Sequence, residues 1–400
     1  MSPEIKDTKT GEIPKEWEVL SLEEVTVDLI GGGTPSTSQP EYWDGDIPWM
    51  TSANLIDRIV IRGMRNITEK GLKNSATNVV PKGSLLISTR VGIGKVGIAE
   101  IDVAISQDLT GLVPDKDKAD VEYLYWAILN KSSQLSGLSQ GSTVKGLTRE
   151  YVRNLKLPLP PLAEQKKIAE ILSTLDQAIE RVNEAIEKTQ RLKKGLMQEL
   201  LTKGIGHKEF KDTEIGKVPK EWEVVRLSNV FKLASGKSRP KEISDKQTDK
   251  MPIPVYGGNG VLGYTNKFMV DNETVVIGRV GEYCGSIHKT LKSSWITDNA
   301  LYAAVIEKRQ ISLDFFTYYL VFINLNKFKK ESGQPLMTQT IVYSISCPLP
   351  PLPEQQKIAE ILSAVDERLE LLRKRKERLE RVKKGLMNDL LTGRKRVTLN

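Results

Sequence analysis

One glycine-rich segment has the spacing of a cofactor site. Gly92-Ile93-Gly94-Lys95-Val96-Gly97 matches the G-x-G-x-x-G pattern of a dinucleotide-binding turn and follows an apolar, strand-like run. Such a turn holds pyrophosphate only when it opens a helix, whose first amide groups face the charge. Residues 98–105 are rich in β-branched side chains, which favours a strand. Residues 281–285 also break the glycine spacing in the equivalent stretch, so we expect no cofactor.

Other catalytic patterns are missing from the sequence. It contains no P-loop and no G-x-S-x-G turn. It also lacks the Asn-Pro-Pro-aromatic motif that an amino-methyltransferase would need. The only cysteines and histidines are Cys284, Cys347, His207 and His288, which argues against a disulfide framework and against a metal site. We therefore expect a non-catalytic chain without a metal or cofactor of its own.

Several loop side chains could instead read DNA, and the formal net charge of +8 favours a polyanionic partner. Arg90 and Arg279 follow apolar runs and precede glycine, which suits contact with a phosphate or a guanine edge; a structural ion pair would explain them equally well. Residues 237–241 form either a basic DNA-binding loop or a solvated turn. Tyr256, Asn259 and Tyr283 are expected in glycine-rich turns. The candidate DNA-binding residues are Thr34, Ser36, Arg90, Lys95, Lys145, Lys237, Arg239, Lys241, Tyr256, Asn259, Arg279 and Tyr283.

The chain repeats itself in tandem. Residues 6–19 and 211–224 share 10 of 14 positions, and residues 158–172 (PLPPLAEQKKIAEIL) and 348–362 (PLPPLPEQQKIAEIL) share 13 of 15. RLKKGLMQELLT at 191–202 returns as RVKKGLMNDLLT at 381–392. A repeat of this kind predicts two similar units, each a globular segment followed by one distinctive segment.

The distinctive segment is predicted to be a long helix after a stiff Pro-Pro entry. Apolar residues then recur every three or four positions, which is the seam of a coiled coil, with a polar interruption near Thr189 and Lys193. Two such helices can pair antiparallel about a pseudo-two-fold axis, or each can pack on its own globular segment. We favour the antiparallel pair. The seam residues are Ile168, Leu172, Leu175, Ile179, Val182, Ile186, Leu196 and Leu200, then Ile358, Leu362, Val365, Leu369, Leu372, Leu379, Leu386 and Leu390.

The globular segments are predicted to be β-rich, with small helices at 121–130 and 313–324. The two copies diverge strongly here, although Arg90-Val91-Gly92 and Arg279-Val280-Gly281 still correspond. Large aromatic residues usually supply burial, so we interpret Trp17, Trp222, Trp43 and Trp49 as packing residues. The basic run at 373–384 carries interleaved acids, which favours an ion-paired helix surface over a phosphate-binding one.

These motifs resemble those of type I restriction–modification specificity subunits. The resemblance rests on the helix entries PLPPLAEQ and PLPPLPEQ with LDQAIE and VDERLE, and on the repeated (I/V)PKEWEV. It also rests on GGGTPS at 31–36, followed by Tyr42-Trp43 and Ile47-Pro48-Trp49. The second globular segment departs from the pattern because it lacks GGGTPS and Tyr-Trp. The resemblance implies a mixed α/β (α+β) fold: two β-rich target recognition domains, residues 1–157 and 205–347, joined by helices in residues 158–204 and 348–400.

The resemblance also implies a function. Each recognition domain is expected to read half of a bipartite, asymmetric site on double-stranded DNA, while the helix pair sets the gap and docks two methyltransferase subunits that carry S-adenosylmethionine. A restriction subunit can join such assemblies. The chain itself is expected to be cytoplasmic, because no signal peptide or long apolar span is present. Two alternatives stay open: a self-contained DNA methyltransferase or nuclease, and a coiled-coil interaction protein that does not read DNA.

Overall fold

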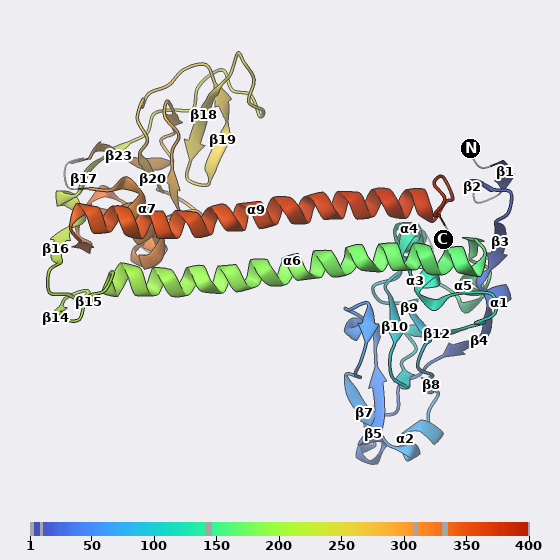
Figure 1. Cartoon of the computed structure of the whole chain (residues 1–400). Helices are drawn as coiled ribbons and strands as arrows, with labels where there is room; N and C mark the ends of the chain where they lie inside the picture. Colours follow the sequence, from blue (N-terminus) through green and yellow to red (C-terminus); the bar gives the residue numbers. More distant parts are fainter. Residues whose placement is uncertain (1–3, 9–10, 141–145, 307–310, 330–334, 399–400) are drawn as a thin grey trace. The chain divides into compact units, whose positions relative to one another are not determined.

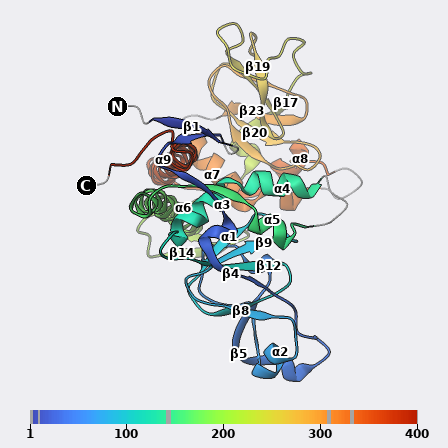
Figure 2. The same cartoon turned by 90° about the vertical axis from the view of Figure 1, so that its right-hand side faces the viewer.

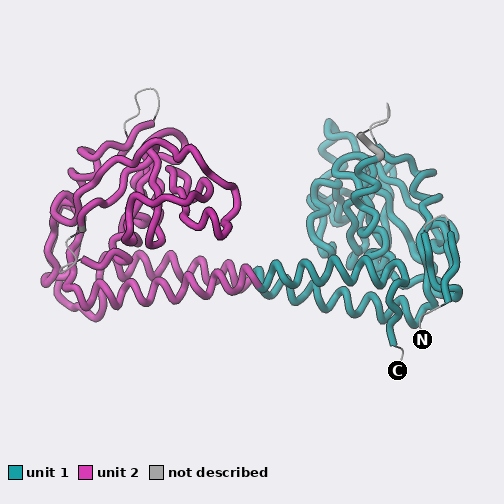
Figure 3. The backbone as a smooth tube through the Cα atoms, turned by 90° about the horizontal axis from the view of Figure 1, so that it is seen from above, with its two compact units in different colours: residues 1–183, 375–400 teal, residues 184–374 magenta. Residues whose placement is uncertain are grey.

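The computed structural model describes residues 4–8, 11–140, 146–306, 311–329 and 335–398. The chain forms two compact units, residues 1–183 with 375–400 and residues 184–374 (Figure 3). Two long helices, α6 (Leu162–Lys203) and α9 (Leu352–Leu390), contribute one segment each to both units. The β-rich remainder is called the first head in the first unit and the second head in the second unit.

The first head is built on a five-stranded sheet of order β4-β12-β9-β10-β6 and a four-stranded sheet of order β7-β5-β11-β8 (Figure 1). Two interior strands, β9 and β10, bury all four of their residues, mostly leucine, valine and isoleucine. The strands are β1 (Ile5–Thr8), β2 (Gly11–Pro14), β3 (Glu18–Ser21), β4 (Thr26–Gly31), β5 (Trp43–Met50), β6 (Ile59–Val60), β7 (Arg65–Ile67), β8 (Asn78–Val80), β9 (Leu85–Ser88), β10 (Val96–Ala99), β11 (Val103–Ile105), β12 (Leu109–Pro114) and β13 (Lys156–Leu159).

Short helices cover the first head. The side chain of Asp120 accepts a hydrogen bond from the Tyr123 amide (3.0 Å) and so caps α3, a helix whose interior residues are buried. The helices are α1 (Leu22–Val25), α2 (Glu69–Lys73), α3 (Val121–Asn130), α4 (Ser132–Gln140) and α5 (Arg149–Arg153).

The second head has a four-stranded sheet of order β17-β23-β20-β21 and a three-stranded sheet of order β19-β18-β22. Its helices are α7 (Leu313–Ile323) and α8 (Gln339–Tyr343). The strands are β14 (Phe210–Thr213), β15 (Gly216–Pro219), β16 (Glu223–Arg226), β17 (Phe231–Ser235), β18 (Ile253–Gly257), β19 (Gly260–Thr265), β20 (Val275–Gly278), β21 (Ile287–Lys289), β22 (Trp295–Ile296), β23 (Ala300–Ile306) and β24 (Ser346–Leu349).

The two heads repeat one plan. In the first, β12 lies between β4 and β9; in the second, β23 lies between β17 and β20. Each head also closes with an antiparallel pair between an early strand and the strand before the long helix, β3 with β13 and β16 with β24. The predicted mixed α/β fold, with a β-rich head and a long helix occurring twice, is confirmed.

The long helices run antiparallel, as predicted. Within the first unit the beginning of α6 lies beside the end of α9, and within the second unit the end of α6 lies beside the beginning of α9 (Figures 1 and 2). Lys383 pairs with Asp176 in the first unit and Lys193 with Asp366 in the second. No described helix is both long enough and apolar enough to cross a membrane.

The predicted polar interruption of the seam is not an interruption. Thr189 is buried, and its hydroxyl donates to the Ala185 carbonyl of its own helix (2.7 Å). Lys193 is half-buried and is neutralised by Asp366 across the helix pair (2.6 Å between Nζ and Oδ1). Polar residues can therefore occupy seam positions because each one has a partner, and the heptad pattern runs on through them to Leu200.

The repeated motifs are explained by one buried contact in each unit. The indole of Trp17 donates to Glu164 at the start of α6 (3.1 Å), and the indole of Trp222 donates to Glu354 at the start of α9 (2.9 Å). Both tryptophans are fully buried, which confirms their predicted packing role. Each carboxylate is also bound by residues that follow the other long helix. Arg396, after α9, contacts Glu164 (2.6 Å) in the first unit, and the Ile205 amide, after α6, donates to Glu354 (2.9 Å) in the second.

The glutamine of each helix entry ties a head to its long helix. Gln165 accepts from the Asp120 amide (2.9 Å), and Gln355 accepts from the Ser312 amide (2.8 Å). Asp120 and Ser312 are the residues that cap α3 and α7, so each glutamine holds the first turn of a head helix. The Pro-x-x-x-Glu-Gln sequence is thus a joint between head and helix.

Candidate nucleic-acid interface

The glycine-rich segment GGGTPS lies at one end of the first head, directly after β4. A side chain at Gly32 would place its Cβ 2.1 Å from the Ile105 carbonyl oxygen, so only glycine allows this approach. The indoles of Trp49 and Trp43 donate to the carbonyls of Gly33 (3.2 Å) and Ser36 (3.1 Å). The two tryptophans are buried, as predicted, and hold this segment in place.

Thr34 and Ser36 are exposed on this segment. The Thr34 hydroxyl donates to the side-chain oxygen of Gln107 (2.7 Å), and the Ser36 hydroxyl is 2.8 Å from that of Ser38. Hydroxyl and amide groups on a rigid surface segment can bond to phosphates or base edges. The segment therefore presents polar groups in fixed positions.

A polar hollow of about 380 Å³ opens beside this segment. Arg90 and Arg149 both line it, and neither forms an ion pair with another described residue. The Arg149 guanidinium lies against Gly31, where a Cβ would come within 1.8 Å of its Nη2. Two exposed guanidinium groups without carboxylate partners suit an anionic ligand or a guanine edge. The other lining residues are Gly32, Thr89, Gln107, Thr110, Gly146, Leu147 and Thr148.

Ser235-Gly236-Lys237-Ser238 occupies the same place in the second head. A Cβ at Gly236 would lie 2.1 Å from the Thr297 carbonyl oxygen, which matches the close approach at Gly32. The Lys237 amide donates to the Ile296 carbonyl (2.9 Å), as the Gly33 amide donates to Ile105 (2.9 Å). The second head therefore has a lysine where the first has a glycine. Lys237, Arg239 and Lys241 are all exposed, and none pairs with a described carboxylate.

Arg90 and Arg279 do not occupy equivalent positions on their sheets, which corrects the sequence correspondence. Each arginine lies two residues before a glycine with positive φ, Gly92 or Gly281. The Arg279 amide donates to the Asn299 carbonyl, whereas in the first head Thr89 makes the matching bond, to Asp108 (2.9 Å each). The loop after β20 is one residue longer up to its closing glycine, Gly285 against Gly94. Arg279 is half-buried, while Arg90 is exposed.

Tyr256 was predicted in a surface turn, and this is wrong. It lies in β18, with a ring buried beside Val276 and Ile296, and its hydroxyl accepts from the Leu291 amide (3.3 Å). Burial raises the pKa of this phenol. The flanking glycines suggested a turn, but the alternation of the strand directs this side chain inward. Tyr256 is therefore not available to a duplex.

Asn259 and Tyr283 are exposed in turns, as predicted. Gly258 places them close together: a Cβ built on it would lie 4.0 Å from the Tyr283 Cβ and 3.3 Å from the Asn299 carbonyl oxygen. Asn299 is itself bonded to the amide of Arg279. The backbone at Gly258, next to Asn259, therefore lies near Tyr283 and Asn299, and the Arg279 backbone lies on the other side of this contact.

Lys95 is exposed, and its side chain folds over Gly92. The segment after it is strand β10, not a helix, so the G-x-G-x-x-G spacing opens no pyrophosphate site. Lys145 lies outside the described residues. Among the described residues, no three His, Cys, Asp or Glu side chains gather as metal ligands would.

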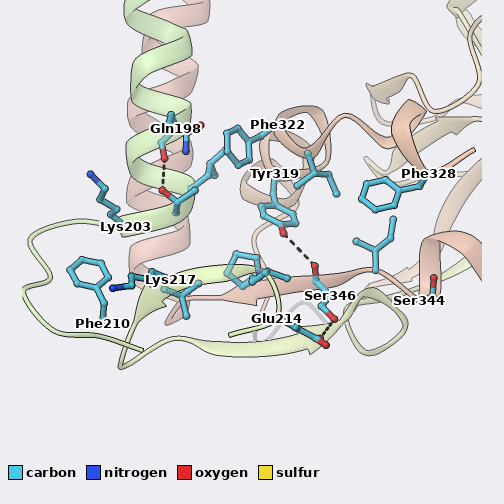
Figure 4. Close-up of a pocket in the computed structure, with 17 residues that line it drawn as sticks. Gln198, Lys203, Phe210, Glu214, Lys217, Tyr319, Phe322, Phe328, Ser344 and Ser346 are labelled. Atoms are coloured by element: carbon cyan, nitrogen blue, oxygen red, sulfur yellow. Dashed lines mark hydrogen bonds between the residues drawn. The ribbon is translucent and has the colours of Figure 1, made fainter. Parts of the chain in front are cut away.

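Sequence reasoning missed Gln107, Arg149 and Asn299. Gln107 and Asn299 lie in turns and Arg149 begins α5; none belongs to a motif, and only the fold brings each next to a predicted residue. A second hollow, about 810 Å³, lies in the second unit between the end of α6, the β14–β15 hairpin and α7 (Figure 4). Phe210, Tyr319, Phe322 and Phe328 contribute to its walls, which hold none of the predicted DNA-binding residues.

Comparison with known proteins decides the family. The family model described as the type I restriction modification DNA specificity domain matches residues 14–189 and 219–381. The chain belongs to the type I restriction–modification specificity subunits. It is 33% identical to the putative type I restriction enzyme MjaX specificity subunit of Methanocaldococcus jannaschii, over 98% of this chain and 96% of that protein. It is 29% identical to the MjaVIII specificity subunit of the same organism, over 96% and 94%.

The fold of this specificity subunit also matches solved structures. The S subunit of a type I restriction–modification system from M. genitalium aligns with a TM-score of 0.66 and 17% identity, over 98% of this chain and 99% of that one. At that identity the likeness concerns the fold. The two matches of the family model each begin in a head and end in a long helix, so the structural repeat and the family domain coincide.

Proposed function

We propose that this specificity subunit reads double-stranded DNA, and that each head recognises one half of a bipartite, asymmetric site. One observation carries the proposal: the equivalent segments 31–36 and 235–238 of the two heads have exposed cations on or beside them, and these cations lie at different positions in the two heads. These are Arg90 and Arg149 in the first head and Lys237 and Arg239 in the second. Guanidinium and ammonium groups bind phosphates and guanine edges. Because the two heads differ, the two half-sites should differ.

Selection from a pool of random duplexes tests the proposal. The purified chain, with its methyltransferase subunit, should enrich two short unlike motifs separated by a constant number of unread base pairs. Binding should weaken steeply with salt, because phosphate contacts release counterions. A chain that binds no DNA would instead support the alternative of a coiled-coil interaction protein.

Two methyltransferase subunits are the proposed partners of the helix pair. Leu192 on α6 and Val382 on α9 hold equivalent places in the repeat, and both are exposed. An apolar residue repeated on the outer face of both helices fits two copies of one partner. A restriction subunit is proposed as a further component of the assembly.

S-adenosylmethionine is proposed to act on the methyltransferase partner and not on this chain. The specificity subunit alone should transfer no methyl group to DNA that carries its site, and addition of the methyltransferase should start the transfer. Methyl transfer by the purified chain alone would favour the alternative of a self-contained enzyme. The radiolabelled methyl group incorporated into DNA is the readout.

Removing the two arginines of the first-head hollow should weaken DNA binding. For Arg90→Ala/Arg149→Ala, we expect a loss of about 1–3 kcal/mol for each arginine that reads a base edge. An arginine on a phosphate instead lowers the slope of log K against log salt by about 0.9. Fluorescence anisotropy over a salt series measures both quantities.

A matched control removes two charges elsewhere in the first unit. Lys116 and Lys166 are exposed and lie outside the hollow. Lys116→Ala/Lys166→Ala should leave affinity within about twofold of the parent, because distant surface charges are screened at physiological salt. Equal losses in both variants would mean that net charge, and not the hollow, governs binding.

A further inference from the structure

Two lysines lie in the seam between the long helices. Lys193 of α6 and Lys383 of α9 are the same residue of the repeat, in RLKKGLM and RVKKGLM. Both continue the heptad spacing of the seam, and their side chains are only 26% and 21% exposed. A seam position is normally apolar, so a lysine there needs a specific partner.

The partners are reciprocal. Lys193 pairs with Asp366 (2.6 Å) in the second unit, and Lys383 pairs with Asp176 in the first. Asp176 and Asp366 are also the same residue of the repeat, in LDQAIE and VDERLE. Each long helix thus supplies one lysine and one aspartate, and the antiparallel arrangement brings both pairs together at once.

Each lysine also touches its head. The Lys383 ammonium lies 4.8 Å from the ring centre of Trp126 on α3, and the Lys193 ammonium lies 5.5 Å from that of Tyr318 on α7. The Tyr318 hydroxyl donates to Asp366 (2.9 Å), so one carboxylate serves two groups. Three helices therefore meet at each lysine: both long helices and one helix of the head.

Sliding the helices would break these contacts together. A slip of one heptad moves one helix by about 10 Å along the other and keeps leucine facing leucine. It would nevertheless take both lysines from their aspartates and their rings and leave them against apolar neighbours. An unpaired, partly buried charge is strongly disfavoured, whereas an apolar replacement of the pair is tolerated. Within the seam itself, the lysines discriminate between registers that leucine–leucine contacts accept equally.

We propose that the pairs Lys193–Asp366 and Lys383–Asp176 fix the register of the two long helices, and thereby the number of unread base pairs in the site. The first half concerns the helices alone. The second half rests on the proposed function, because it assumes that the heads read DNA. In this account the four residues are specificity-determining positions that never touch a base.

The test replaces the seam lysines by leucine, in Lys193→Leu/Lys383→Leu. Spin labels on Glu199→Cys and Glu360→Cys, two exposed sites of the second unit, report the register of the helices without DNA. Native Cys284 and Cys347 are buried and should stay unlabelled. We expect one label distance in the parent and at least two in the variant, and gaps that differ by about three base pairs in DNA selection.

The sequence offers a closely matched control. Lys194 and Lys384, the neighbours of the seam lysines, are exposed, so Lys194→Leu/Lys384→Leu has the same composition with the substitution outside the seam. It should keep one distance and one gap.

The outcomes separate the two claims. One unchanged label distance in the leucine variant would overturn the inference about register, whatever gap the DNA selection gives. A mixture of distances with one unchanged gap would overturn the link from register to the site. If the parent itself selects no bipartite site, the proposed function is contradicted. The label distances, which are measured without DNA, would still test the inference about register.

Discussion

Replacement of Trp222 by alanine is expected to lower the free energy of unfolding by about 3–5 kcal/mol. The indole is fully buried in the second unit, and its N–H satisfies Glu354 at the start of α9. Alanine would leave a cavity and remove one hydrogen bond of a carboxylate that is itself mostly buried. Because Glu354 lies where head and helix meet, the loss should also loosen the second head from α9. Urea unfolding followed by circular dichroism measures it.

Trp295 provides the comparison for this substitution. It lies in the same head but is only half-buried, and its indole donates to the Ser238 carbonyl (3.2 Å). Trp295→Ala should cost clearly less than Trp222→Ala, while Trp17→Ala should match Trp222→Ala because it makes the same contact with Glu164. Equal costs at Trp295 and Trp222 would contradict the special role of the Trp–Glu joint.

Insertion of one heptad into both long helices is expected to widen the unread gap by about three base pairs. Seven residues add about 10 Å of helix, and one base pair spans about 3.4 Å. The insertions should follow Glu187 in α6 and Glu377 in α9, which are equivalent in the repeat, so that the seam stays in register. Three base pairs also turn the duplex by about 100°, so affinity should fall even for the widened site.

Insertion into one helix only is the control for this variant. It displaces the two seams relative to each other and separates the Lys–Asp pairs, so we expect a less stable protein that selects no single gap. Selection from random duplexes reads out both variants. A double insertion that keeps the parental gap would show that the helix pair does not measure the distance.

The fold was predictable from the sequence wherever the repeat preserved it. The Pro-Pro entries and the heptads located α6 and α9, and the repeated tryptophans were correctly predicted to be buried, although their contacts with Glu164 and Glu354 were not predicted. These features are local in sequence or occur twice. Lys193 was misinterpreted as part of an interruption, because polarity alone does not reveal a partner that lies on the other helix.

The candidate site was only partly predictable. Thr34, Arg90 and Lys237 are exposed at equivalent ends of the two heads, but Arg149 and Gln107 join them only through the folded sheet. Alignment on the nearby glycine matched Arg279 with Arg90, whereas the backbone hydrogen bonds match Arg279 with Thr89. Glycine neighbours suggested a turn at Tyr256, where pairing in β18 buries the ring.

Methylation mapping of genomic DNA tests the central claim most directly. Cells that hold this chain and its methyltransferase should carry methyl groups at one asymmetric motif, made of two unlike halves around a fixed run of unread bases. Deletion of the chain should abolish that methylation. Methylation at an uninterrupted motif, or methylation that persists without the chain, would contradict the account.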